Sequence, residues 1–314
     1  MPIKASQLNP ELRAIYRFVP NLPTGRLWRI RAIRRLLRAA PQPKRPTGMT
    51  FEKIDFGPGA GVRVFTPASG GSGAALLFLH GGGMVIGAAS QEDARLIQIA
   101  DELDIVTVSV EYRLAPENPY PAPLDDCLQA WRWLQDNAKA RGIDPERIAV
   151  GGQSAGGGLA AGLALRIHDE LPVQPIAQLL FCPMLDDRTA ADRTRDAENN
   201  FLWNNRSNLT GWTAYLGDAP GGPEVPAYAA PSRRRDLSGL PAAWIGTGDI
   251  ELFFTEDRSY AEGLSAAGVD CTLVVVPGAP HAFESVAISA PIAKKYSADA
   301  LAWLKQQLTI TGNN

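Results

Sequence analysis

The chain has 314 residues, of which 45% are hydrophobic and 20% are charged. This composition provides a large apolar core and excludes an intrinsically disordered chain, and no apolar run approaches the roughly 18 residues that a membrane-spanning helix needs. The first residues lack the continuous apolar stretch of a secretory signal. Three cysteines, Cys127, Cys182 and Cys271, have no metal-binding or Cys-x-x-Cys spacing, so we expect buried thiols in a soluble, cytoplasmic protein.

The net charge of −2 conceals an uneven distribution of charge along the chain. Residues 1–50 contain eleven basic residues and a single acid, Glu11, so this part carries +10 and the remainder carries −12. A basic segment of this kind can bind nucleic acid, an anionic membrane or the acidic body of its own chain. We favour the acidic body or solvent, and we expect neither nucleic-acid binding nor stable membrane insertion.

The first 48 residues are predicted to form a helical cap. Asn9 and Pro10 are a suitable N-cap and first-turn pair for one helix. A second helix is predicted over residues 27–39, with apolar side chains on one side and arginines on the other. The two sets are Ile30, Ile33, Leu36 and Leu37, and Arg31, Arg34, Arg35 and Arg38. The proline-rich stretch 41–46 cannot continue a helix and is predicted to be a linker.

From residue 49 to residue 314, predicted strands alternate with helices. The strands span residues 51–56, 62–66, 74–79, 105–111, 147–151, 176–182, 242–247 and 271–276, and the clearest helices span 91–103, 124–140 and 294–308. This alternation predicts an α/β fold with a mostly parallel central sheet covered by helices on both faces. Residues 186–228 are long and rich in aromatic side chains, which predicts an irregular additional lid over one edge of the sheet.

Ser154 lies in the sequence Gly152-Gln153-Ser154-Ala155-Gly156, directly after a predicted strand and before a predicted helix. This strand–turn–helix context is typical of a nucleophile elbow, in which a strained turn exposes the serine hydroxyl. The N-terminus of the following helix favours negative charge developing at the site. The alternative, a glycine-rich turn without chemical function, fits this context less well.

A run of three glycines, Gly81–Gly83, follows His80 at the end of the buried strand 74–79. Glycines leave the backbone N–H groups accessible, and such groups can receive an oxyanion. The rival interpretation is a phosphate-binding turn, but no Lys-Ser/Thr pair follows and no Gly-x-Gly-x-x-Gly pattern is present. We therefore expect an oxyanion loop here.

His281 is the predicted general base, because it follows the last strand and the other two histidines are placed less suitably. A carboxylate should follow a strand between Ser154 and His281 in the chain. Asp249 fits best, and Asp186 is its competitor at the end of another strand. Two further acids, Glu251 and Asp257, are expected to lie on the next helix and to face solvent.

Several motifs together resemble the hormone-sensitive-lipase-like esterases, also called bacterial esterase family IV, within the α/β-hydrolase fold. The resemblance covers residues 49–308 and depends on five segments. They are the glycine loop 80–83 with Gly87 after it, Tyr112–Glu117 (YRLAPE), Gly152–Gly157 (GQSAGG), the Asp249 segment and the His281 loop. One departure is Gln153, because the family usually has Asp, Glu or Thr before the serine. We assign no chemistry to residues 112–117.

The resemblance implies a serine esterase whose site residues match the family motifs position by position. Ser154 would be the nucleophile, His281 the base and Asp249 its orienting acid, and the amides of Gly82, Gly83 and Ala155 would form the oxyanion hole. It also implies short- to medium-chain acyl ester substrates, a cap formed by the N-terminal helices, and no metal or organic cofactor. A homodimer is left open.

Three other functions remain open on the sequence. The same residues could hydrolyse amides or carbamates. A ligand-binding protein of this family is expected to have lost the catalytic histidine, whereas His281 is present. The arginines of the N-terminal segment could instead attach the protein to an anionic membrane surface.

Overall fold

A computed structural model describes residues 3–19, 24, 27–39 and 41–309 of the chain. Eight strands form one sheet in the order β1-β2-β4-β3-β5-β6-β7-β8. They are β1 (Thr50–Gly57), β2 (Ala60–Thr66), β3 (Ala75–Leu79), β4 (Val106–Glu111), β5 (Ile148–Gln153), β6 (Ala177–Phe181), β7 (Ala242–Gly248) and β8 (Cys271–Val276). Strand β2 is antiparallel to β1 and β4, and the remaining pairings are parallel. The predicted α/β class is confirmed, and every predicted strand is present with ends shifted by at most two residues.

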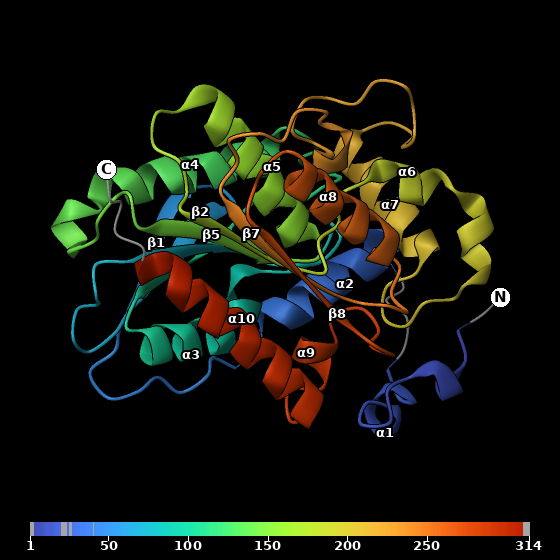
Figure 1. The fold of residues 1–314 in the computed structure, drawn as a ribbon, viewed down its shortest axis with the longest axis horizontal. Coiled ribbons are helices and arrows are strands. Elements are labelled where there is room, and N and C mark those ends of the chain that lie inside the picture. The colour runs from blue at the N-terminus through green and yellow to red at the C-terminus, as the bar shows by residue number, and fades with distance from the viewer. Residues whose placement is uncertain (1–2, 20–23, 25–26, 40, 310–314) are drawn as a thin grey trace.

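Helices cover both faces of this sheet (Figure 1). One face carries α4 (Ala122–Asn137), α5 (Ala155–Glu170) and α8 (Phe254–Ala266), and the other carries α3 (Asp93–Leu103) and α10 (Pro291–Thr309). Strand β3 shows why both layers are needed, since all five of its residues are buried. Because side chains alternate along a strand, Leu77 and Leu79 belong to one core cluster and Leu76 and Phe78 to the other.

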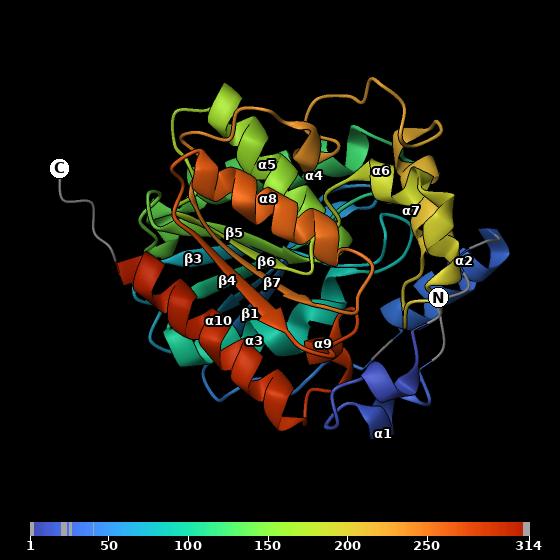
Figure 2. The same cartoon turned by 45° about the vertical axis from the view of Figure 1, so that its right-hand side comes forward.

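Short helical segments complete the fold. They are α1 (Arg13–Tyr16), α2 (Leu27–Arg38), α6 (Asp187–Ala191), α7 (Asn205–Leu216) and α9 (Phe283–Val286), with 3-10 turns at Ala5–Gln7, Ala89–Glu92, Lys139–Arg141, Arg193–Ala197 and Pro231–Arg233. Figure 2 shows α2, α6 and α7 close together at one end of the sheet. In the described part of the chain, no helix has both the length and the apolar character required to cross a membrane.

The helix predicted behind Asn9 and Pro10 is reduced to the single turn α1. Asn9 caps the turn that leads into α1, because its Oδ1 accepts the Glu11 N–H (3.1 Å), and it has a second use: its backbone N–H donates to the carbonyl of Gly278 (2.8 Å) and its side-chain amide donates to the carbonyl of Pro277 (3.2 Å). These bonds tie this part of the chain to the segment that follows β8. Three apolar side chains on the same stretch are buried in the core cluster that includes α10: Leu8, Leu12 and Tyr16.

Helix α2 confirms the predicted second helix but not its division into an apolar and a basic side. Ile30 is buried, whereas Leu36 is 74% exposed. Arg34, which was expected to face outward, is only 13% exposed. It donates to the carbonyls of Val85 (2.8 Å) and Ala115 (2.6 Å) and to the Glu117 carboxylate (2.9 Å). Because Arg34 follows the buried Ile30 by four residues, a little more than one helical turn, it lies at the edge of the buried side of α2. From there its long side chain reaches the carbonyls of Val85 and Ala115.

The ion pair between Arg34 and Glu117 connects the basic segment to the acidic body. Burial alone would raise the pKa of Glu117, but the hydrogen bond from Arg34 brings the pKa below its ordinary value. Arg31 lies near the same carboxylate, at 3.7 Å. At least these two arginines therefore face acidic protein, as the charge asymmetry predicted.

The segment 186–228 is more regular than predicted, because it contains α6, a 3-10 turn and α7. Each of these begins at a polar side chain that accepts a backbone N–H in the first turn, namely Asp186, Asp192 and Asn204. Trp203, Trp212 and Tyr215 are buried there. Capping and aromatic packing, rather than a long amphipathic pattern, stabilise these short helices.

We predict that Arg34→Met lowers the free energy of unfolding by about 1–3 kcal/mol, because it removes three charge-assisted hydrogen bonds at a half-buried position. Arg35→Met is the matched control, since Arg35 is exposed on the same helix, and we expect a change within about 0.5 kcal/mol. Urea unfolding of both variants measures the difference. Equal stability of the two variants would contradict the proposed anchoring of α2.

Candidate active site

Ser154 lies at the sharp junction between β5 and α5, with a left-handed φ of 55° and a ψ of −120°. Its backbone is fixed from both sides: the Ser154 N–H donates to the carbonyl of Phe181 (2.8 Å), and the Ser154 carbonyl accepts from Met184 N–H (2.9 Å). A Cβ on Gly156 would lie only 2.0 Å from the carbonyl oxygen of Leu79. The glycine after the serine is therefore required for helix α5 to approach strand β3, as a nucleophile elbow demands.

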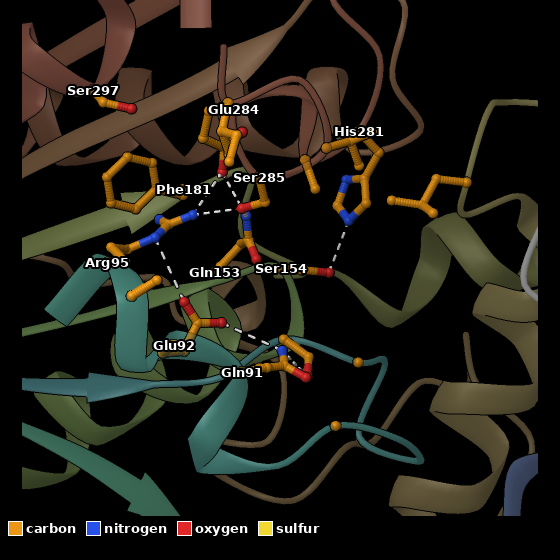
Figure 3. A pocket seen from close by; sticks show the side chains of 18 of the residues that line it. Gln91, Glu92, Arg95, Gln153, Ser154, Phe181, His281, Glu284, Ser285 and Ser297 are labelled. Atoms are coloured by element: carbon orange, nitrogen blue, oxygen red, sulfur yellow. Dashed lines mark hydrogen bonds and ion pairs between the residues drawn. The ribbon is translucent and has the colours of Figure 1, made fainter. Parts of the chain in front are cut away.

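The imidazole of His281 connects Ser154 to a carboxylate. His281 Nε2 lies 2.9 Å from Ser154 Oγ, and Nδ1 lies 2.7 Å from Glu251 Oε2. Figure 3 shows the His281 ring directed at the serine hydroxyl. The His281 side chain is 4% exposed and the Glu251 side chain is fully buried, so both hydrogen bonds are shielded from water. The other Glu251 oxygen accepts from Thr247 Oγ1 (2.7 Å), which fixes the carboxylate.

The carboxylate that contacts His281 belongs to Glu251 and not to Asp249, which corrects the sequence prediction. Asp249 is exposed, and its Oδ1 accepts the backbone N–H of Gly278 at 2.6 Å. Strand β7 ends at Gly248 and α8 begins at Phe254. The intervening loop buries Glu251 against His281, whereas Asp249 stays exposed. The expectation that Glu251 and Asp257 face solvent is also wrong, because both are buried.

Two other carboxyl groups lie near this site, and they differ from Glu251: Asp186 has other partners, and Asp257 has a raised pKa. Asp186, the competing candidate, caps α6 and forms an ion pair with Arg188 (2.6 Å). Burial raises the pKa of Asp257 well above its ordinary value, and the nearby charges of Glu251 and Glu256 raise it further. Asp257 therefore stays protonated to a higher pH than an ordinary aspartate. Glu251 is the carboxylate placed to stabilise a protonated His281.

The glycine loop after β3 lies against the elbow. A Cβ on Gly83 would lie 2.1 Å from the Trp203 ring, so the segment 186–228 packs directly on this loop. The hydrogen bonds found within the described residues use none of the amides of Gly82, Gly83 and Ala155, the three predicted oxyanion donors. These amides are thus available to a ligand, and their role as an oxyanion hole stays a proposal.

Residues 112–117 support this loop structurally. The Tyr112 ring stacks on the His80 ring with centroids 4.1 Å apart, and the Tyr112 hydroxyl donates to the carbonyl of His80 (2.7 Å). Arg113 forms a bidentate pair with Asp126 on α4. These contacts fix the turn at which the glycine loop begins.

A cavity of about 950 Å³ opens beside Ser154. Its apolar lining comes from helix α2, the loop after β3, the segment 186–228 and α10: Ile33, Leu37, Ile86, Leu202, Trp203 and Leu301. A volume of this size accommodates a small organic molecule. Among the described residues, no group of three or more His, Cys, Asp or Glu side chains is arranged to hold a metal ion.

Residues 76–285 match a protein family whose description is 'alpha/beta hydrolase fold'. The chain belongs to this family of α/β hydrolases. The hormone-sensitive-lipase-like branch inferred from the motifs is confirmed by the relatives that follow.

Curated and solved members of the α/β-hydrolase family resemble this chain over most of its length. Carboxylesterase NlhH of Mycobacterium tuberculosis is 36% identical over 237 residues, which is 74% of this chain and 73% of the relative. Ethyl acetate hydrolase of Pseudomonas putida is 33% identical, over 71% of this chain and 70% of the relative. The structure titled bacterial heroin esterase is 36% identical, with a TM-score of 0.87 over 96% of this chain and 98% of that one.

We predict that Glu251→Gln lowers kcat by about 10³- to 10⁴-fold, because a neutral amide can neither hold the required tautomer of His281 nor stabilise its protonated form. Asp249→Asn makes the same chemical change two residues away and should lower kcat by less than about 10-fold. Steady-state hydrolysis of p-nitrophenyl butyrate compares the two variants. A larger loss in Asp249→Asn would restore Asp249 as the orienting acid.

Proposed function

We propose that this protein is a serine carboxylesterase that hydrolyses short- to medium-chain acyl esters through an acyl-enzyme on Ser154. The observation that carries the proposal is the continuous hydrogen-bonded series Glu251–His281–Ser154 at the bottom of an apolar cavity. The protein is a carboxylic ester hydrolase by its family and its relatives. A small-molecule ester is accordingly its substrate.

The first half of the reaction acylates Ser154. His281 Nε2 accepts the hydroxyl proton while Ser154 Oγ bonds to the ester carbonyl carbon. The carbonyl oxygen becomes an oxyanion that the amides of Gly82, Gly83 and Ala155 receive, each donor lowering the barrier by about 3 kcal/mol. The bond to the leaving oxygen then breaks, and the proton on His281 passes to the alcohol.

The second half regenerates the enzyme. A water molecule loses a proton to His281 Nε2 and attacks the acyl carbon, and the same amides receive the second oxyanion. Collapse of this intermediate breaks the bond to Ser154 Oγ, which takes back the proton and releases the acid. Throughout both halves Glu251 faces Nδ1, so it stabilises the imidazolium each time it forms.

The apolar lining of the cavity supports an acyl substrate, and one relative supports a short acyl chain. Leu37 and Leu301 contribute apolar wall from two separate segments, while Trp203 covers the glycine loop. Ethyl acetate hydrolase among the relatives acts on a short ester, as its name states. We further propose a reducing, cytoplasmic location, which the unpaired thiols of Cys127, Cys182 and Cys271 support.

We predict that Ser154→Ala abolishes hydrolysis of p-nitrophenyl butyrate, with a loss of at least about 10³-fold in kcat, because no nucleophile remains to form the acyl-enzyme. Circular dichroism should show an unchanged fold. A burst of p-nitrophenol equal to the enzyme concentration, present in the wild type and absent from the variant, would identify the acyl-enzyme directly. Retention of most activity by Ser154→Ala would overturn the proposed function.

We also predict that kcat/KM for p-nitrophenyl esters is highest between the acetate and the octanoate and falls for the dodecanoate, in line with the short ester in the name of the Pseudomonas putida relative. Ile33→Trp should shift this optimum toward shorter chains by filling the cavity from α2. An optimum at the dodecanoate would argue against the proposed chain length while leaving the esterase assignment in place.

A further inference from the structure

Gln153, the residue directly before the nucleophile, departs from the acidic residue or threonine usual in the family. Its side chain is buried, at 6% exposure. Both hydrogens of its amide nitrogen are used: Nε2 donates to Glu284 Oε1 (2.5 Å) and to Ser285 Oγ (2.6 Å). A carboxylate at this position could donate neither bond.

The two acceptors belong to the segment that carries the general base. Glu284 and Ser285 lie on α9, three and four residues after His281. Gln153 is the last residue of β5, and its side chain therefore connects this strand to the segment that carries the imidazole. Figure 3 shows these side chains meeting on the side of Ser154 away from His281.

Arg95 on α3 completes the cluster. Its Nη2 donates to Ser285 Oγ (2.6 Å) and Glu284 Oε1 (3.3 Å), and its Nε lies 3.5 Å from Glu92 Oε2. Burial acts to lower the pKa of Arg95, but Glu92 and Glu284 more than offset that effect, so the guanidinium stays charged. The guanidinium also lies 4.6 Å above the Phe181 ring.

The charge count explains why an amide suits position 153. Glu92 and Glu284 already share the single cation of Arg95. A third carboxylate at position 153 would face the buried Glu284, and among the described residues Arg95 is the only cation that pairs with Glu92 and Glu284. An amide instead supplies two donors without adding charge. Gln153 and Glu284 are thus complementary as donor and acceptor.

We propose that Gln153 is a positioning residue, whose amide holds the His281 segment against the nucleophile elbow through Glu284 and Ser285. The inference rests on the proposed roles of Ser154 and His281. Losing this connection would let the imidazole drift from the 2.9 Å contact with Ser154 Oγ, and a displacement of about 1 Å costs about 10²-fold in rate. Gln153 also lines the cavity, but both of its amide hydrogens bind Glu284 and Ser285 and not a ligand, so kcat should change more than KM.

The decisive experiment exchanges the amide and the carboxylate. Gln153→Glu should lower kcat for p-nitrophenyl butyrate about 10- to 100-fold at pH 8, with KM within about threefold, and activity should recover toward lower pH as the carboxyl pair regains a proton. In the double variant Gln153→Glu/Glu284→Gln the amide of residue 284 donates to the carboxylate at 153. Its kcat should return to within about fivefold of the wild type, with the normal pH profile.

Two further variants separate positioning from folding and from charge alone. Gln153→Met removes the donors without adding charge, so kcat should fall with no new pH dependence. Gln135→Glu makes the same substitution on α4, where Gln135 donates to the Pro145 carbonyl away from the cavity, and kcat should stay within about twofold. Thermal unfolding of each variant confirms that the compared enzymes are folded.

A wild-type kcat and pH profile in Gln153→Glu would overturn the proposal, and so would a double variant no faster than Gln153→Glu. If Gln153→Glu does not fold, the kcat and KM of Gln153→Met decide the question, and unchanged values overturn it. Ser154→Ala measured in parallel keeps the two proposals apart. An inactive Ser154→Ala beside a fully active Gln153→Glu would reject only the positioning role, whereas an active Ser154→Ala would reject the esterase mechanism itself.

Discussion

The close approach of backbone to backbone at the β5–α5 junction is the constraint on which the site depends. Helix α5 can lie against β3 only because Gly156 has no side chain, and this contact leaves Ser154 in a left-handed conformation that is unfavourable for a side-chain-bearing residue. Two backbone hydrogen bonds, to Phe181 and from Met184, keep it there. The strain thus holds the hydroxyl in the cavity before any substrate binds.

The base is held in place by contacts from parts of the chain that are far apart in sequence. The Tyr16 hydroxyl donates to the carbonyl of His281 (3.1 Å), and Asn9 and Asp249 both bind the loop at Gly278. The basic N-terminal segment therefore does more than line the cavity through Ile33 and Leu37, because Asn9 and Tyr16 support the loop that carries His281. Asp249 acts on the same loop, so its position near the site is explained without a bond to the imidazole.

The sequence was sufficient wherever local chemistry determined the structure. Continuous apolar runs located the buried strands, and the strand–turn–helix context located Ser154. The sequence was insufficient where the path of a loop decides which way a side chain points. Asp249 and Glu251 lie two residues apart in one loop, and only the turn of the backbone puts Glu251 beneath His281. Arg34 was misplaced for a related reason, since a pattern of residue types does not show which flank of a helix meets free carbonyls.

The carboxyl groups under the site differ in charge because their surroundings differ. Burial raises the pKa of Asp257 and of Glu256, and the latter also accepts two backbone N–H groups at residues 185 and 186. A carboxyl group whose pKa is higher in the folded state loses stabilisation as pH rises above its unfolded value. The fold bears this cost beside the base, where Asp257 is protonated more readily than an exposed aspartate. Of these three carboxyl groups, Glu251 is the one with an oxygen facing His281 Nδ1, so it is the group placed to stabilise the imidazolium that forms when Ser154 gives up its proton.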